Sequence, residues 1–464
     1  MKFLFIYPPN SNLELGPSKH FEIGAHVPPI GVLYLAKILE LKGYEVEVLD
    51  LNADKSNNEQ IKGKILSSDF VGLTLYSGLI SINNTIKLSK IVKETDPDIP
   101  LLIGGPQCSY YPERSIIKNQ ADVCVKGEAE NVIIPVVEAL QGKGKLSTIP
   151  GIYYKKGNSL KKTKKPVPIN DLDSLPFPGR HLVEKYDYGY MSGLKMSKGK
   201  TTSIITSRGC PLKCRFCGLN YIVPGYRRRS NENIIKEIEE IIDSGYKTLV
   251  FVDDNFLQNK KAAEKIMDFI IKKNADIRIW IEETRIDSAN ETLYQKMKDA
   301  GTEFIHYGIE SGNQEILDYY NKNINLDQIR YAVNLCKKME FFVVGSFILG
   351  APIEIREQIE NTKKFAKSIP LDGAYFYSFV YMIGSPIWED CVKEGKIKPD
   401  VYFENIDKNK GLGNFTKKEM ADIVNKVYYS YYLDPRLWLR ELSYGFRKKD
   451  FRFIRQGLKV LSPF

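Results

Sequence analysis

Short apolar runs alternate with helix-like segments over the first 141 residues. The apolar runs lie near residues 2–7, 45–50, 70–75, 100–104 and 122–126. Such alternation is typical of a parallel, doubly wound sheet, in which ligands bind at the carboxyl ends of the strands. We therefore predict a doubly wound α/β domain over residues 1–141.

A second alternating stretch runs from Thr201 to about Phe379. Strands are expected near residues 201, 248, 277, 303, 342 and 374, and a helix is expected after each of the first five. The helix predicted over 231–244 carries isoleucines on one face and charges on the other, with Gly245 as its stop. These units predict a partial (β/α)6 barrel over residues 199–390, with its site at the carboxyl ends of the strands.

Two segments lack this alternation. Residues 142–198 are rich in Lys, Gly, Pro and Tyr, and this proline density argues against both a helix and a central strand. We predict a linker there. Residues 391–464 favour a small helical C-terminal region, in which the run Tyr428-Tyr429-Ser430-Tyr431-Tyr432 is typical of a core or a domain interface, with a substrate pocket as the alternative.

Three cysteines, Cys210, Cys214 and Cys217, lie within eight residues. Neighbouring Gly209 and Pro211 keep the segment out of a helix, so one loop can bring three sulfurs together. Three thiolates can hold three irons of a 4Fe-4S cluster and leave the fourth iron open for chemistry. The alternatives are structural zinc and a disulfide, but zinc would need a fourth ligand, and the nearest histidine, His181, lies well upstream.

Composition changes this picture only slightly. The 464 residues are 43% hydrophobic and 27% charged, as in an ordinary globular protein of several domains. The sequence has no apolar run near 18 residues and no signal peptide, which predicts a cytoplasmic protein. The other four cysteines are scattered, which favours a reducing compartment.

The cysteine spacing, with Phe216 before the third cysteine, resembles the radical S-adenosylmethionine (SAM) superfamily. In that superfamily the three cysteines hold a 4Fe-4S cluster. Its open iron binds SAM, and the reduced cluster cleaves SAM to a 5′-deoxyadenosyl radical. The resemblance implies these two cofactors and an enzyme.

Polar residues at the later strand ends extend the resemblance. Asp253 and Asp254 stand where the Gly-Gly-Glu motif that receives the SAM amine usually lies, so which aspartate does so is open. Arg285 matches a contact to the SAM carboxylate, and its guanidinium suits that role. Glu310 and Ser311 match the ribose element.

The first domain resembles the cobalamin-binding Rossmann-like domain. Ser77 and Leu79 follow the third strand, and Gly104 and Gly105 follow the fourth, as in the channel for the cobalamin nucleotide tail. The Asp-x-His-x-x-Gly motif that supplies an axial histidine is missing, and Tyr7-Pro8-Pro9-Asn10 stands there instead. The resemblance therefore implies cobalamin without histidine ligation; a flavodoxin-like or nucleotide-binding module is the alternative.

Three more residues bear on the cobalt environment. His20 and His26 lie in the loop after the first strand, and a hydrogen bond within the loop or between domains is favoured over ligation for both. Tyr76 precedes Ser77 and is predicted to cover the lower face of the corrin. Simple packing of an aromatic ring at a strand end is the alternative for Tyr76.

Both domains together resemble the cobalamin-dependent radical SAM enzymes, most of which are methylases. The resemblance implies transfer of a methyl group from methylcobalamin to an unactivated carbon. The alternatives are a tetrapyrrole-type cyclase, a tRNA methylthiotransferase and a non-enzymatic cobalamin or iron-sulfur sensor. Methylthiotransferases carry three further cluster cysteines, whereas only Cys108 and Cys124 precede the triad here.

The expected partners follow from the same resemblance and from charge. We expect an electron donor such as ferredoxin or flavodoxin, no specific nucleic acid, and a small-molecule, lipid or peptide substrate. The net charge is +10, and residues 434–464 carry eight Arg or Lys against three acidic residues. This basic segment with Trp438 and Leu439 suits peripheral contact with a membrane, although packing on the barrel is the favoured alternative.

Overall fold

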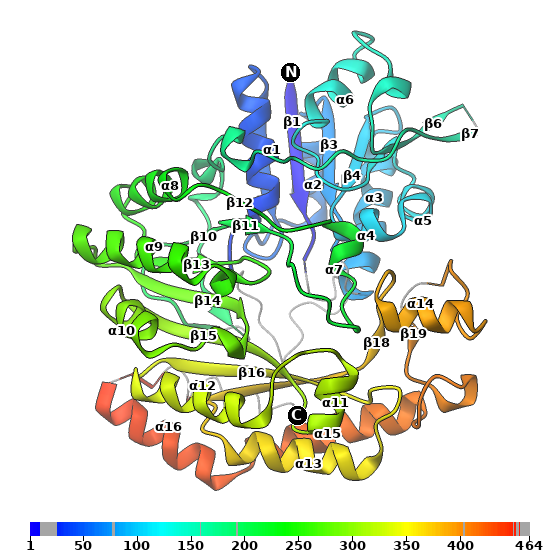
Figure 1. The fold of residues 1–464 in the computed structure, drawn as a ribbon. Coiled ribbons are helices and arrows are strands. Elements are labelled where there is room, and N and C mark those ends of the chain that lie inside the picture. The colour runs from blue at the N-terminus through cyan, green and yellow to red at the C-terminus, as the bar shows by residue number, and fades with distance from the viewer. Residues whose placement is uncertain are drawn as a thin grey trace. The chain divides into compact units, whose positions relative to one another are not determined.

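The computed structural model describes residues 1–9, 26–76, 79–157, 159–191, 194–401, 404–448, 450–451 and 454 (Figure 1). The chain divides into two compact units, Met1–Lys195 and Met196–Phe464. The sequence predicted four segments. Nearly all of the expected linker, 142–198, falls within unit 1, and the expected C-terminal region, 391–464, falls within unit 2.

Unit 1 contains a seven-stranded sheet in the order β2-β1-β3-β4-β5-β6-β7. Its strands are β1 (Lys2–Tyr7), β2 (Glu45–Asp50), β3 (Phe70–Thr74), β4 (Leu101–Gly104), β5 (Val123–Val125), β6 (Ile152–Lys156) and β7 (Ser159–Lys162). The first five are parallel, and the last two join antiparallel. The predicted strands are all present.

Helices cover both faces of this sheet (Figure 1). They are α1 (Ile30–Leu41), α2 (Asn58–Leu66), α3 (Leu79–Thr95), α4 (Pro106–Tyr110), α5 (Pro112–Lys118) and α6 (Ile133–Leu140). One buried apolar cluster contains Leu33 of α1 and Val136 of α6, and a second contains Ile61 of α2 and Leu88 of α3. Two cores on opposite faces make the unit doubly wound, as predicted.

The segment predicted as a linker, 142–198, is largely folded into unit 1. Its β6–β7 hairpin extends the sheet, and Ile169, Leu172 and Val183 are buried. Proline density correctly excludes a helix or a central strand, but residues 152–162 contain no proline and pair at the sheet edge. Two further strands, β8 (Tyr190–Met191) and β9 (Leu194–Lys195), form a small ribbon.

Unit 2 contains a six-stranded parallel sheet in the order β10-β13-β14-β15-β16-β17. Its strands are β10 (Thr201–Ile204), β13 (Thr248–Phe251), β14 (Arg278–Thr284), β15 (Thr302–Glu310), β16 (Phe342–Leu349) and β17 (Gly373–Ser378). Strands β10 and β17 stand at the two ends of the order. The sheet is therefore an open array, and the predicted partial barrel is confirmed.

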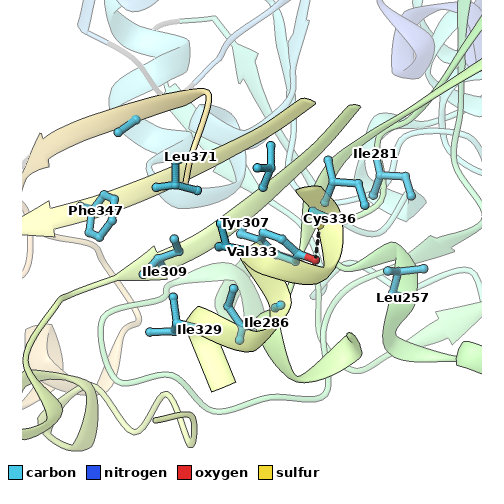
Figure 2. Close-up of a cluster of buried hydrophobic side chains, with 14 of the residues drawn as sticks. Leu257, Ile281, Ile286, Tyr307, Ile309, Ile329, Val333, Cys336, Phe347 and Leu371 are labelled. Carbon is cyan, nitrogen blue, oxygen red and sulfur yellow. Dashed lines mark hydrogen bonds between the residues drawn. The ribbon is translucent and has the colours of Figure 1, made fainter. Parts of the chain in front are cut away.

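Helices pack on one face of this sheet around a single apolar cluster (Figures 1 and 2). They include α8 (Asn231–Asp243), α9 (Lys260–Lys273), α10 (Glu291–Asp299), α11 (Gln314–Tyr319), α12 (Leu326–Lys338) and α13 (Arg356–Ser368). Figure 2 shows Tyr307 and Ile309 of the sheet against Val333 and Cys336 of α12, with the Tyr307 hydroxyl 3.3 Å from the Cys336 sulfur. Helix α8 agrees with its prediction and is capped by Ser230.

The C-terminal residues complete this unit. They include β18 (Val380–Tyr381), α14 (Pro386–Lys393), β19 (Glu404–Asn405), α15 (Lys417–Tyr432) and α16 (Pro435–Lys448). The hydroxyls of Tyr431 and Tyr432 donate to the Leu371 and Ala374 carbonyls, so these two tyrosines are part of the core. Helix α16 buries Leu437 against the core cluster, as the packing alternative expected. No helix in the described ranges is long and apolar enough to cross a membrane.

Candidate active site

The cysteine loop follows β10. Strand β11 (Ser207–Arg208) pairs antiparallel with β12 (Arg227–Arg228), which brings the two ends of the loop together. Gly209 has φ +79°, and a β-carbon there would lie 2.0 Å from the Gly225 carbonyl oxygen. Only glycine fits at position 209, where the backbone passes this close to the Gly225 carbonyl.

The three thiols on this loop are free and partly buried. Burial raises the pKa of Cys217 to about 11, and charge on Cys214 and Cys210 raises it further. Within the described residues, no three His, Cys, Asp or Glu side chains are already arranged around one metal position. The thiols are nevertheless reduced, close enough to interact and carried by a loop without other metal-ligating side chains, which is a donor set that fits iron–sulfur ligation.

Two aspartates at the end of β13 tie down this loop. Asp253 is buried and accepts hydrogen bonds from the Thr206 N–H (3.1 Å), the Thr206 hydroxyl (2.7 Å) and the Ser207 hydroxyl (2.6 Å). Asp254 is exposed and accepts from the Gly209 N–H at 2.8 Å. Loss of water around the carboxyl groups raises the pKa of both aspartates, and the hydrogen bonds that they accept oppose this rise. Asp253 is committed to the protein, which leaves Asp254 as the better candidate for the SAM amine.

Arg285 lies beside the cysteine loop, with Nη1 3.8 Å from the Cys214 sulfur. Its Nε donates to Asp287 at 3.0 Å, and its Nη2 donates to the Lys322 carbonyl at 2.6 Å. The guanidinium is thus held in place by protein acceptors. Its predicted contact with the SAM carboxylate stays a prediction.

Glu310 ends β15 in an unusual backbone conformation, φ +71°. The register with β16 shifts between Gly308 and Glu310, and the Glu310 carboxylate accepts from Lys322 Nζ at 2.7 Å in a buried ion pair. Positive φ in a residue other than glycine is uncommon and marks a position that the surroundings enforce. The Lys322 ammonium also lies 5.8 Å from the Phe216 ring.

Ser311 is fully buried, and its hydroxyl lies 3.2 Å from the Thr362 hydroxyl and accepts from the Asn313 N–H. These contacts give Ser311 a structural role in this turn. The ribose role for Glu310 and Ser311 stays a prediction.

Sequence reasoning missed two residues at these strand ends. Lys322, the partner of Glu310, has no local signal because it lies beyond a helix. Glu354 is buried, and its carboxylate accepts from the Gly350 N–H (2.6 Å) and the Ala351 N–H (3.1 Å). Burial raises the pKa of Glu354 to about 7. A carboxylate four residues after Gly350 was the sequence feature that could have indicated a side chain accepting from the N–H groups of this turn.

In unit 1 the paired glycines stand at the end of β4. Gly105 has φ +98°, and a β-carbon there would lie 2.8 Å from both Thr74 Oγ1 and the Leu75 carbonyl oxygen. The ends of β3 and β4 therefore approach more closely than any larger residue allows. Gly104 has room for a β-carbon, with Val125 the nearest neighbour at 4.0 Å.

The other residues predicted for this end of the sheet are only partly described. Ser77 and the side chain of Leu79 lie outside the described residues, as does His20. Tyr76 is 51% exposed after β3, with its ring edge-on to Tyr7 at 6.4 Å. His26 has Nδ1 3.0 Å from the Tyr190 carbonyl oxygen, which is the loop hydrogen bond expected for it.

Comparison with known proteins assigns both units. Residues 204–366 match the model of the radical SAM superfamily, and residues 21–136 match that of the B12 binding domain. An uncharacterized methyltransferase of Pyrococcus horikoshii is 30% identical over 99% of this chain and 98% of its own length. The chain belongs to the cobalamin-dependent radical SAM enzymes. Its cofactors are a 4Fe-4S cluster, SAM and cobalamin.

Two further proteins are similar to this radical SAM enzyme. The anaerobic magnesium-protoporphyrin IX monomethyl ester cyclase of Rubrivivax gelatinosus is 29% identical over 93% of this chain and 79% of its own. The solved structure of TsrM, a radical SAM methyltransferase of Kitasatospora setae with cobalamin and a 4Fe-4S cluster bound, covers 85% of this chain and 75% of its own at TM-score 0.65 and 16% identity. The likeness to TsrM shows a shared fold.

Replacing Gly209 by Ala tests the crossing in the cysteine loop. An Ala at positive φ costs about 1–2 kcal/mol, and here the new carbon also meets the Gly225 carbonyl at 2.0 Å. We expect Gly209→Ala to hold well under half the iron and sulfide of the wild type after anaerobic reconstitution. Gly225→Ala is the matched control, since Gly225 has φ +75° but no atom within 4 Å of its added carbon. Equal iron content in the two variants would contradict the steric argument.

Proposed function

We propose that this enzyme transfers a methyl group to an unactivated carbon of its substrate. The observation that carries the proposal is the pairing of a radical SAM unit and a B12 binding unit in one chain, in the same arrangement along the sequence as a relative named a methyltransferase. When bound, the cluster and SAM would supply the 5′-deoxyadenosyl radical, and cobalamin would supply the methyl group.

The residues of this chain would then bind and orient the reactants. Cys210, Cys214 and Cys217 would hold the cluster, and Asp254 would accept from the SAM ammonium. Asp253 keeps the cysteine loop at the end of the sheet through its three donors. The Glu310–Lys322 ion pair holds the fourth strand end rigid beside Phe216.

A cyclase is the second candidate, because a magnesium-protoporphyrin IX monomethyl ester cyclase is 29% identical over 93% of this chain. A methylase consumes SAM as methyl donor and releases S-adenosylhomocysteine in addition to 5′-deoxyadenosine. A cyclase releases no S-adenosylhomocysteine. The ratio of the two products therefore separates the candidates once a substrate is supplied.

The cysteine assignment is tested by SAM cleavage. Reconstituted wild type, reduced anaerobically with SAM, is expected to form 5′-deoxyadenosine, and the Cys210/Cys214/Cys217 triple Ala variant is expected to form none. Cys391→Ala is the control, since Cys391 is a free, partly buried thiol elsewhere in the same unit. Cleavage by the triple variant would refute the cluster assignment, and a wild type that binds both cofactors without cleaving SAM would indicate a sensor.

Cobalt is expected to have no histidine below it. No Asp-x-His-x-x-Gly motif follows β1, and His26 is hydrogen-bonded to Tyr190. The electron paramagnetic resonance spectrum of the bound cob(II)alamin should then lack axial nitrogen splitting. Nitrogen splitting that disappears in a His20 or His26 variant would overturn the absence of histidine ligation.

A Tyr76→Ala variant should make reduction of the bound cob(II)alamin to cob(I)alamin harder, because water then reaches the lower face of the corrin.

The compartment is proposed to be the cytoplasm. Recovery of the native protein in an extracytoplasmic fraction would refute the compartment.

The electron donor is proposed to be a ferredoxin or a flavodoxin. Reduced ferredoxin or flavodoxin should replace a chemical reductant in the SAM cleavage assay. Failure of both proteins to do so, with chemical reduction still effective, would refute the donor.

Peripheral contact with an anionic membrane is proposed for α16. The helix buries Leu437 but leaves Leu439 and Phe446 on its outer side, 68% and 71% exposed, within a basic part of the chain. An apolar stripe beside basic residues suits a lipid headgroup layer. Leu439→Ser with Phe446→Ser should lower sedimentation with phosphatidylglycerol vesicles roughly tenfold. Leu41→Ser, at an exposed leucine of unit 1, is the control; equal sedimentation of all three proteins would contradict the proposal.

A further inference from the structure

One turn of unit 2 holds the cysteine loop in place. It covers residues 320–323, between α11 and α12. Its Tyr320 carbonyl accepts from the Arg215 N–H at 2.8 Å. Its Asn321 side-chain amide donates to the Lys213 carbonyl at 2.9 Å. The two bonded loop residues stand on either side of the second cysteine, so the backbone that carries this sulfur is fixed to the turn.

The same turn also holds the guanidinium of Arg285. The Lys322 carbonyl accepts from Arg285 Nη2 at 2.6 Å. Asp287 binds the edge formed by Nε and Nη2, with distances of 3.0 Å to Oδ1 and 3.1 Å to Oδ2. A planar guanidinium gripped along one edge by a carboxylate keeps a single orientation. The sulfur and the guanidinium are therefore anchored to one rigid element.

This orientation directs the remaining nitrogen of Arg285 at the cysteine loop. Nη1 donates to the Cys214 sulfur at 3.8 Å. A guanidinium has five N–H groups, of which three go to Asp287 and Lys322 and one goes to the sulfur. One N–H on Nη1 is left for a further acceptor. The contact with the sulfur is thus compatible with the predicted contact to the SAM carboxylate.

The positive charge of Arg285 is not cancelled at the sulfur. Asp287 binds the edge of the guanidinium that does not include Nη1. The Asp287 side chain is 43% exposed, so water screens its charge, whereas the Arg285 side chain is 9% exposed. A thiolate at Cys214 therefore meets a hydrogen-bond donor and a buried positive charge.

We propose that Arg285 raises the reduction potential of the 4Fe-4S cluster by donating to the Cys214 sulfur, and that Asp287 is the positioning residue that orients Arg285. Hydrogen bonds to the sulfurs and nearby charge are among the factors that set the potential of such clusters. Reduction adds one electron from the external donor, so a positively charged N–H donor stabilises the reduced cluster more than the oxidised one. A higher potential eases reduction by a ferredoxin or a flavodoxin. The inference rests on the proposed cysteine ligands and not on methyl transfer.

Redox titration in the absence of SAM tests the role of Arg285. Full-length Arg285→Gln is reconstituted anaerobically and titrated with dithionite and mediators, and the reduced cluster is followed by electron paramagnetic resonance. At a fixed potential, the ratio of reduced to oxidised cluster is expected to be about tenfold lower than in wild type, which is a midpoint about 59 mV more negative. Leaving SAM out removes the predicted carboxylate contact from the comparison. Equal midpoints in the two proteins would overturn the proposal.

Arg278→Gln is the matched control. Arg278 begins β14, at the opposite end of this strand from Arg285, and pairs with Glu303. Its replacement changes the net charge by the same amount, so an equal midpoint to wild type is expected. A drop as large as that of Arg285→Gln would assign the effect to net charge and overturn the proposal.

A conservative variant covers the case in which Arg285→Gln binds no iron. Arg285→Lys keeps the positive charge but lacks the planar guanidinium that reaches two acceptors and the sulfur at once. Its midpoint is also expected to be more negative than that of wild type. An unchanged midpoint in Arg285→Lys would then overturn the hydrogen bond to the sulfur.

A double-mutant cycle tests the positioning role of Asp287. Asp287→Asn removes a negative charge, which by itself raises the midpoint. If Asp287 also orients Arg285, the rise must be smaller in the wild-type background than in the Arg285→Gln background, or must reverse. Equal shifts in both backgrounds would overturn the positioning role.

Iron content separates the possible failures. A wild type that holds no 4Fe-4S cluster on the three cysteines would refute the cysteine assignment. Full iron content with equal midpoints refutes only the role of Arg285. Methyl transfer is judged apart from both, by the ratio of S-adenosylhomocysteine to 5′-deoxyadenosine.

Discussion

The candidate site depends on the hydrogen bonds that the two aspartates after β13 accept from the start of the cysteine loop. Asp253 collects one backbone and two hydroxyl donors from Thr206 and Ser207, and Asp254 takes the Gly209 N–H. A buried carboxylate is costly unless donors surround it, so Asp253 keeps these groups in one arrangement. The carboxyl end of β13 thereby positions the cysteine loop that follows β10.

Irregular backbone aims the polar groups around that loop. A register shift accompanies the positive φ of Glu310, which pairs with Lys322, and the bulge in β14 places Glu283 Oε1 3.8 Å from His306 Nδ1. Such distortions persist only where the surrounding structure enforces them. Here the apolar cluster beneath the sheet does so, because Ile281 and Tyr307, next to the bulge, are fully buried.

The same barrel serves different reactions in the relatives of this enzyme. A methyltransferase and a cyclase are both similar to it over more than nine-tenths of its length. Similarity along the chain therefore leaves the reaction undecided, and the reaction has to be argued from the residues of the site.

The sequence by itself determined the fold class, the cysteine triad and the family. Alternating apolar runs reveal parallel α/β units, and a cluster loop needs only ligands that are close along the chain. The β6–β7 hairpin was missed because prolines on both sides masked its short proline-free run. Only the tertiary structure decided that Lys322 pairs with Glu310, that the Lys322 carbonyl accepts from Arg285 and that Glu283 contacts His306. These contacts join residues of different elements, and the register of neighbouring strands and the packing of the turns between them set which side chains meet.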